Sequence, residues 1–341
     1  MADCRHNAAI RPQKAGERHM SVNIQPGHIA RHTPRGAGSQ SREAAIIDIA
    51  QDLLLRHLRE DNVLDRLVFK GGTSLRKLYA GNAGRFSLDL DFSILSIGEE
   101  QDDVMADLIG SIEGLSIGPF NYDVSERRGK WYIEFMHPFG TDSGNLRSKL
   151  DISPPTWIPP VEKDWVPMPI HAAYGDNGLP KILTMRLEEN ISEKIARLNR
   201  VTPARDLYDL RWIMTTASIA SYLDLPLIRR LAVLKIWCDA NGVSADRTYW
   251  KPGHDAFPFE PETWLRDRSN EDIDVEDIGA LATPTPTPRE LSESVSKLFG
   301  FLKDLTEDER KIAATREQDR SLALKMLGEL PGGRLRGIGL Y

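Results

Sequence analysis

The sequence has few cysteines and no long apolar run. Its two cysteines, Cys4 and Cys238, lie too far apart to suggest a disulfide framework or a thiolate metal site. No apolar stretch approaches the roughly 18 residues that indicate a membrane span. Residues 1–40 lack the apolar segment of a secretory signal. We therefore expect no membrane partner and a cytoplasmic location.

An excess of charge of one sign, internal repeats and a P-loop are also lacking. The 44 Lys and Arg residues against 50 Asp and Glu residues give a formal net charge of −6. Overall charge therefore does not indicate a nucleic-acid-binding protein, although it leaves room for a local basic surface. No GxxxxGK(S/T) loop is present, which excludes the usual P-loop nucleotide site.

The pattern of strand-like and helix-like segments changes along the chain. Residues 1–40 show little periodicity, and we expect a flexible N-terminal tail. Residues 41–170 mix strand and helix patterns, and residues 171–341 are mostly helical. The sequence thus predicts an α+β protein with a mixed sheet flanked by helices, followed by a helical C-terminal region.

Hydrophobic periodicity and turn residues place the individual elements. Arg128 and Gly129 indicate a hairpin turn, and Thr202 followed by Pro203 is typical of a helix N-cap and first turn. We expect helices over 41–60, 73–79, 99–113, 183–200, 203–214, 226–240, 289–304 and 307–328, and strands over 67–69, 86–94, 122–127, 130–137 and 146–152.

Two aspartates occupy one side of the predicted strand 86–94. Its residues alternate strictly between apolar and polar, so Asp89 and Asp91 share a face with Ser87. Two carboxylates this close repel each other unless something neutralises them. Hard oxygen ligands of this kind suit Mg²⁺, although an Asp-X-Asp by itself also occurs on ordinary solvent-facing strands.

A diglycine turn precedes this strand in the sequence. Gly71 and Gly72 lie between a short apolar strand and a helix that starts near Thr73 and Ser74. Free backbone N–H groups and the positive end of a helix dipole favour phosphate, and glycine lets the backbone approach it closely. A phosphate-binding turn beside an acidic strand is a suitable pair for a nucleoside triphosphate and its metal.

Four sequence motifs resemble those of one family and occur in the same order. The segments FKGGTSLRKLY, RFSLDLDFS, KLDIS and EKIARLNRVTPARDLYDL, which span about residues 45–215, resemble the AbiEii/AbiGii toxins. These toxins, also called MenT-like, belong to the nucleotidyltransferase superfamily of the polymerase-β type. The resemblance implies a nucleotidyltransferase core over 41–170 and a helical C-terminal domain over 171–341.

The resemblance also implies roles for particular residues. Lys149, two residues before Asp151, faces the same way and is within reach of a phosphate. The implied phosphate-binding turn consists of Gly71, Gly72, Thr73 and Ser74, with Ser87 nearby. The implied ligands of Mg²⁺ or Mn²⁺ are Asp89, Asp91 and Asp151. Of these, Asp151 would also take the proton from the attacking hydroxyl.

The fourth motif contains a lysine on an apolar helix face. Lys194 lies beside the stripe of Leu187, Ile191, Ile195 and Leu198, where a lysine needs an anion. A triphosphate is one candidate, and snorkelling to solvent is the alternative. We predict that Asp206 orients Lys194 or the nucleotide. We further expect Asp209 to pair with Arg205, its neighbour four residues earlier.

Several cations are candidates for contact with phosphate or RNA. Arg76 and Arg85 flank the motif, and either contact with phosphate or RNA or a plain surface position is compatible with the sequence. The helical half offers an acceptor-binding surface, although solvated helix faces explain these residues equally well. These residues are Arg229, Arg230, Arg266, Arg268, Arg310, Lys311 and Arg316.

The predicted activity is metal-dependent transfer of a nucleoside monophosphate from an NTP. The resemblance implies an RNA acceptor, often the 3′ end of tRNA, growth inhibition or abortive infection as the outcome, and a cognate antitoxin as partner. The acidic stretch 271–277 is a possible docking feature for that antitoxin. Two alternatives stay open, namely a nucleotide-binding regulator without transfer activity and a metal-dependent nuclease.

A phosphate or nucleotide attached to Ser87 would silence the enzyme.

Overall fold

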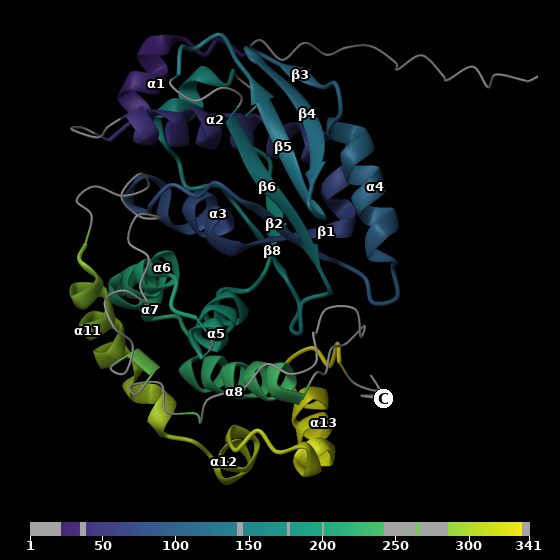
Figure 1. Ribbon diagram of the computed structural model, residues 1–341, viewed down its shortest axis with the longest axis vertical. Coiled ribbons are helices and arrows are strands. Elements are labelled where there is room, and N and C mark those ends of the chain that lie inside the picture. Colours follow the sequence, from purple (N-terminus) through teal and green to yellow (C-terminus); the bar gives the residue numbers. More distant parts are fainter. Residues whose placement is uncertain are drawn as a thin grey trace, which may run out of the picture.

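The computed structural model describes residues 22–34, 39–141, 146–175, 178–199, 201–241, 259, 264–265 and 286–335. Within these residues one mixed sheet of eight strands forms the upper part of Figure 1, in the order β3-β4-β5-β6-β2-β1-β8-β7. The strands are β1 (Leu67–Lys70), β2 (Leu90–Ile94), β3 (Ser116–Ile117), β4 (Phe120–Arg127), β5 (Lys130–Met136), β6 (Leu146–Ser153), β7 (Val161–Lys163) and β8 (Ile182–Thr184).

Helices cover the sheet and build the lower half of the molecule (Figure 1). The predicted combination of a mixed sheet with a helical C-terminal region is confirmed. The helices are α1 (Pro26–His32), α2 (Ser39–Glu60), α3 (Gly71–Leu75), α4 (Gln101–Ile112), α5 (Leu187–Leu198), α6 (Ala204–Thr215), α7 (Ala217–Ala220), α8 (Leu225–Asn241), α11 (Pro288–Leu298), α12 (Glu307–Ala313) and α13 (Arg320–Gly328).

The strand alternation decides which face of the sheet enters the core. On β6, Ser148 is buried and accepts a hydrogen bond of 2.9 Å from Gln51 of α2, whereas Arg147 is exposed. Tyr122 of β4 likewise donates to the carbonyl oxygen of Ala50 on α2. The face towards α2 is therefore the core face, and every second residue of β4, β5 and β6 points to the other side.

The hairpin between β4 and β5 has the predicted turn. Arg128 (φ 54°) and Gly129 (φ 72°) both adopt left-handed backbone conformations, which is the type I′ geometry that matches the twist of two-residue hairpins. In the lower half, the predicted apolar stripe of α5 is confirmed, because Leu187, Ile191, Ile195 and Leu198 are all buried.

The strand predicted over 86–94 begins only at Leu90. In the ladder between β1 and β2, Leu67 pairs with Ile94 and Lys70 pairs with Asp91. The chain turns at Gly71, so β1 has no residue left to pair with the segment before Leu90. Asp89 therefore precedes the strand, and its carbonyl oxygen accepts a hydrogen bond from the Thr73 hydroxyl instead.

Other element boundaries also differ from the prediction. Residues 182–184 form β8 before α5, and α6 begins at Ala204 with Pro203 as its N-cap residue. The helix predicted over 307–328 is two helices, α12 and α13, because the chain between them passes through Thr315 at φ 55°. A single helix cannot include a residue in that conformation.

Part of the predicted N-terminal tail is folded. Helix α1 packs on α2, Ile29 is fully buried, and His32 lies 2.7 Å from Asp48. The prediction of a flexible tail is therefore wrong for residues 22–34. No described helix is both long and apolar enough to cross a membrane.

Candidate active site

The diglycine turn lies directly against the acidic strand. Gly71 has φ +77°, and a Cβ atom built on it would come within 2.2 Å of the Asp91 carboxylate oxygen. A Cβ atom on Gly72 would lie 2.9 Å from the Ser87 hydroxyl and 2.7 Å from the Arg85 guanidinium. At Gly71 the positive φ and this close approach together favour glycine. The two features that the sequence placed together are in contact.

The hydroxyl groups of the turn are engaged with the protein backbone. Thr73 and Ser74 are buried; Thr73 donates to the carbonyl of Asp89, and Ser74 donates to that of Gly71 over 3.0 Å. Asn190 of α5 also donates to Gly71, over 3.3 Å. These contacts fix the turn, and they leave its backbone N–H groups rather than its hydroxyls for an anion.

Three acids, Asp89, Asp91 and Asp151, lie near one another at the centre of the sheet. Asp91 and Asp151 are Cα partners in the parallel pair of β2 and β6, so their side chains project to the same face. Burial raises the pKa of Asp91 to about 6; the charges of Asp89 and Asp151 act in the same direction, and that of Lys70 opposes them. A raised acid pKa of this kind marks a place where negative charge is crowded.

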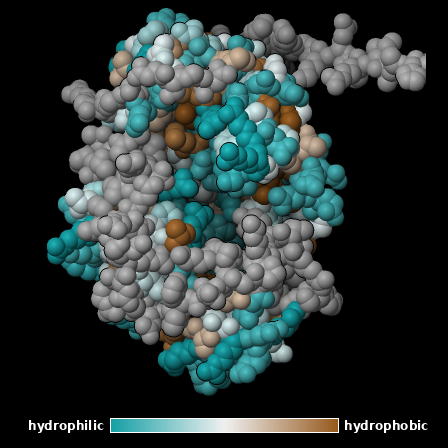
Figure 2. Space-filling view, in the orientation of Figure 1, coloured by the Kyte–Doolittle hydropathy of each residue, from teal (hydrophilic) through white to brown (hydrophobic). Residues whose placement is uncertain are grey.

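Half-exposed cations surround these carboxylates. Arg205 of α6 lies 3.3 Å from Asp89, and Lys149 lies 2.6 Å from Asp151. Partial burial acts to lower the pKa of Lys149, but the hydrogen bond and charge of Asp151 raise it. Figure 2 shows hydrophilic surface where the sheet meets the helical half. The site thus combines an acidic centre with a basic rim.

The donor set suits a hard divalent cation. Carboxylates on adjacent strands are the ligands that Mg²⁺ and Mn²⁺ prefer. As they stand, no three His, Cys, Asp or Glu side chains of the described residues converge closely enough to hold a metal. Asp89 and Asp151 are each turned towards a cation.

Comparison with known proteins identifies the family of this chain. A family model described as nucleotidyl transferase AbiEii toxin, type IV toxin–antitoxin system, matches residues 52–323. The chain belongs to the AbiEii nucleotidyltransferase toxin family. It is therefore a nucleotidyltransferase, its substrate is an NTP, and an antitoxin is its expected cellular partner.

The solved structure of MenT4 agrees with the AbiEii assignment. MenT4, a nucleotidyltransferase toxin from Mycobacterium tuberculosis H37Rv, has 35% sequence identity and a TM-score of 0.76, over 91% of this chain and 100% of that chain. JHP933 from Helicobacter pylori has 16% identity and a TM-score of 0.39, over 83% of this chain and 98% of that chain. No curated protein matches the sequence closely enough to report.

Lys194 of this AbiEii protein faces two carboxylates. Its Nζ atom lies 2.8 Å from Asp206 and 2.9 Å from Asp209, and all three residues are buried. Arg85 also binds Asp209 through two hydrogen bonds of 2.9 and 2.8 Å. The predicted pairing of Lys194 with Asp206 is present. The predicted pairing of Asp209 with Arg205 is wrong, because Arg205 reaches over to Asp89.

We expect Asp206→Asn to destabilise the fold by about 2 kcal/mol at neutral pH. Burial acts to raise the pKa of Asp206, but the charges of Lys194 and Arg197 outweigh it and hold the pKa at about 2. A depressed acid pKa stabilises the fold above pH 3.8, and this contribution disappears as the pH falls towards 2. Urea unfolding at pH 7 and at pH 3 checks this difference.

The control for that experiment is Asp304→Asn, which removes an exposed acid outside the network. We expect it to leave unfolding unchanged at both pH values. A loss for Asp206→Asn that is equally large at pH 3 and pH 7 would contradict the ionic explanation.

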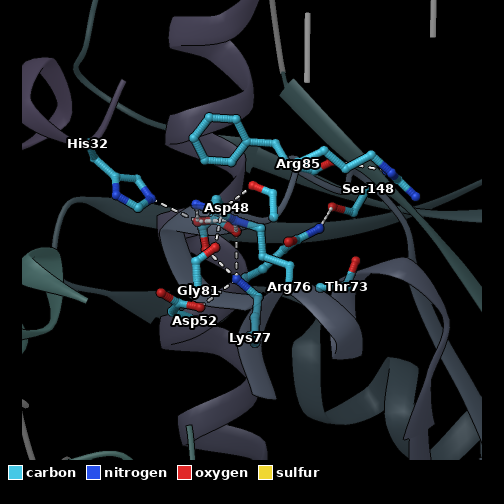
Figure 3. Close-up of polar contacts among 12 residues, drawn as sticks. His32, Asp48, Asp52, Thr73, Arg76, Lys77, Gly81, Arg85 and Ser148 are labelled. Carbon is cyan, nitrogen blue, oxygen red and sulfur yellow. Dashed lines mark hydrogen bonds and ion pairs between the residues drawn. The ribbon is translucent and has the colours of Figure 1, made fainter. Parts of the chain in front are cut away.

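Arg76 binds core residues, which agrees with neither of the two roles that the sequence left open, contact with phosphate or RNA and a plain surface position. It is buried, donates over 2.6 Å to the carbonyl of Gly81, and binds Asp48 of α2 at 3.1 Å. The neighbouring Lys77 is fully buried between Asp48, at 2.9 Å, and Asp52. Figure 3 shows this cluster of buried charges.

The buried cluster ties the diglycine turn to the rest of the core. Burial acts to raise the pKa of Asp48, but the charges of Arg76 and Lys77 hold it well below its usual value. Arg76 also lies 4.2 Å from the centre of the Phe86 ring. Since Arg76 and Lys77 immediately follow α3, their ion pairs fix the orientation of the helix that carries Gly71 and Gly72.

The predicted acceptor surface of the helical half loses one of its members. Arg229 is nearly buried and lies 2.8 Å from Glu309. Lys311 is half exposed and pairs with Glu307 at 3.0 Å. Arg266 and Arg268, together with the acidic stretch 271–277, lie outside the described residues.

Three cations that the sequence reasoning missed face the acids. Lys70 is the Cα partner of Asp91, Arg205 pairs with Asp89, and the charge of Arg197 on α5 also acts on Asp91. The position of Lys70 immediately before the diglycine turn was the available signal. Arg197 and Arg205 lie on α5 and α6, and only tertiary packing brings these helices over the sheet.

Proposed function

We propose that this toxin transfers a nucleoside monophosphate from an NTP to an RNA acceptor in a reaction that needs Mg²⁺ or Mn²⁺. The contact between Gly71 and the Asp91 carboxylate carries the proposal, because it puts a phosphate-binding turn beside three acids. Asp89, Asp91 and Asp151 would hold the metal. When bound, it would neutralise these carboxylates and polarise the α-phosphate.

The chain's own residues would orient the nucleotide. The N–H groups of the Gly71–Gly72 turn, together with Lys70, Arg197 and Arg205, would bind the triphosphate. Lys149 is also within reach of a phosphate. These groups would hold the α-phosphate in line with the incoming hydroxyl, so that pyrophosphate leaves on the opposite side.

Asp151 would take the proton of the acceptor hydroxyl. It is more exposed than Asp89, with 47% of its side chain accessible against 29%. Lys194 and Asp206 lie behind the site; their ion pair would position α5 and α6, which present Arg197 and Arg205. The acceptor would be the 3′ end of tRNA, and the reaction would take place in the cytoplasm.

Incubation with labelled NTPs, Mg²⁺ and total tRNA tests the proposal. We expect labelled RNA with the wild-type chain and none after addition of EDTA. NTP binding without a labelled product would favour a nucleotide-binding regulator, and shortened RNA would favour a metal-dependent nuclease. Either result would contradict the proposed transfer reaction.

We also expect Ser87→Asp to reduce transfer at least tenfold. Ser87 is buried against Gly72, next to the predicted triphosphate position, so a carboxylate there would repel the phosphates. Ser87→Ala is the matched control, because it removes the hydroxyl without adding charge, and we expect it to stay active. Full activity of Ser87→Asp would sink the hypothesis that modification of this serine silences the enzyme.

A further inference from the structure

One face of the sheet beside the acids is open. On β6, Arg147 is exposed and Lys149 and Asp151 are partly exposed, whereas the residues between them are buried. The same face of β5 carries Lys130 and Tyr132. In Figure 1 no described helix crosses in front of β4, β5 and β6, and Figure 2 shows hydrophilic side chains there.

The helical half covers the other part of this face. Lys70 on β1 lies 3.1 Å from Glu193 of α5, and Asn190 of α5 contacts the Gly71 carbonyl. The boundary between the covered and the open part therefore runs along Asp91 and Asp151. A triphosphate bound by the turn and by the cations of α5 and α6 would occupy the covered side. A second substrate would then approach Asp151 from the open side.

The open face has the chemistry of a single-stranded nucleic-acid platform next to Asp151. Tyr132 is the Cα partner of Lys149, and the guanidinium of Arg147 lies 5.1 Å from the centre of its ring. Trp131 is the Cα partner of Leu150, so Lys130 lies level with Asp151. A ring flanked by cations binds RNA through base stacking and phosphate contacts.

The local charge favours the same ligand. In the part of this face nearest the acids, Lys130, Arg147 and Lys149 supply three positive charges. The acid on the same face of β5, Glu134, is engaged by Arg127 and by the Ser125 hydroxyl. Basic residues are therefore concentrated beside the carboxylates although the chain as a whole is acidic.

We propose that the open face of β5 and β6, defined by Lys130, Tyr132, Arg147 and Lys149, binds the single-stranded 3′ end of the RNA acceptor. Tyr132 stacks on a base near the terminus, and Arg147 contacts the backbone. This inference rests on the proposed transfer to RNA. It replaces the helical half as the expected acceptor surface.

The test measures RNA binding separately from transfer. Fluorescence anisotropy with a short labelled single-stranded RNA, without NTP, gives the Kd of the wild-type chain. We expect Tyr132→Ala to weaken binding about tenfold, because one stacked base is lost, and Tyr132→Phe to restore it. Arg147→Ala should weaken binding at all sequences and lower the slope of log Kd against log salt by about 0.7.

A matched control removes an exposed cation elsewhere. Lys325, with 63% of its side chain accessible, lies on α13 in the helical half. Lys325→Ala should leave RNA binding unchanged. Thermal unfolding of the Tyr132 and Arg147 variants should match the wild type, since both side chains lie on the outer face. Their affinity for a non-hydrolysable NTP should be unchanged.

The outcomes separate this inference from the proposed function. Labelled tRNA made equally well by Tyr132→Ala, Arg147→Ala and wild type would overturn the inference and leave the transfer reaction standing. If both variants lose RNA binding and the wild-type chain transfers no nucleotide, the binding surface would be supported and the proposed reaction refuted. Loss of RNA binding in Lys311→Ala but not in Tyr132→Ala would return the acceptor to the helical half.

Discussion

Asp91→Asn should abolish nucleotidyl transfer and at the same time stabilise the folded protein. We expect kcat to fall by at least about a thousandfold, because this carboxylate lies between the other two acids of the proposed metal site and touches the diglycine turn. The free energy of unfolding should rise at pH 7 by about 1 to 2 kcal/mol. The proposed metal-binding role of Asp91 would thus be kept at the expense of stability.

The sign of the stability change follows from the pKa of Asp91, which burial raises from 3.8 to about 6. A raised acid pKa means that the folded state holds the proton more tightly than the unfolded state. The wild type therefore loses stability as the pH rises from about 4 to about 6. The asparagine variant does not, so its advantage should be small at pH 4 and full at pH 7.

Urea unfolding at pH 4 and pH 7, with transfer assays on the same samples, measures both effects. Asp123→Asn, an exposed acid on β4, is the control and should change neither. Equal stability of Asp91→Asn and wild type at pH 7 would show that the acids are not crowded. Substantial remaining transfer would remove Asp91 from the metal-binding set.

Gly71→Ala should lower transfer at least about a hundredfold, because a displacement of about 1 Å at a reacting centre can cost that much. The added methyl group would lie 2.2 Å from the Asp91 carboxylate, and the backbone φ of +77° is unfavourable for alanine. The carboxylate must move away from the turn. We expect a loss of about 2 to 4 kcal/mol in stability, which combines backbone strain with this clash.

Gly98→Ala separates the two contributions. Gly98 has φ +94°, but a Cβ atom there meets nothing within 4 Å. It should therefore lose only the conformational part, about 1 kcal/mol, with transfer intact. Activity measured at a temperature where Gly71→Ala is still folded, checked by circular dichroism, distinguishes a displaced carboxylate from unfolding. Wild-type activity in folded Gly71→Ala would mean that the turn and Asp91 act independently.

Local sequence patterns predicted the parts of the site that follow from short-range geometry. A period of two predicted that Asp89 and Asp91 lie close together, and the charge of Asp89 does act on Asp91, although Asp89 precedes the strand. Two glycines marked a turn, in which Gly71 has φ +77°. The stripe on α5 likewise required only a period of 3.6 residues. The sequences of four motifs indicated the family, and the family-model match to residues 52–323 confirms it.

Strand limits and helix ends were less predictable because partners set them. The segment before Leu90 alternates like a strand, yet β1 ends at Lys70 and offers it no ladder. The buried acids of α2 are a similar case. Asp48 and Asp52 lie on one helix face at a spacing of four, but their charge is tolerated only because Arg76 and Lys77 reach them from another element.

The sequence by itself thus determined the family, the acidic pair, the diglycine turn and the order of most elements, since these depend on neighbours along the chain. The tertiary structure decided which cations face the acids, how Lys194 is neutralised and which face of the sheet stays open. Arg197, Arg205 and Tyr132 come to the site from α5, α6 and β5. Contacts between such distant segments depend on packing and strand order, which local periodicity does not specify.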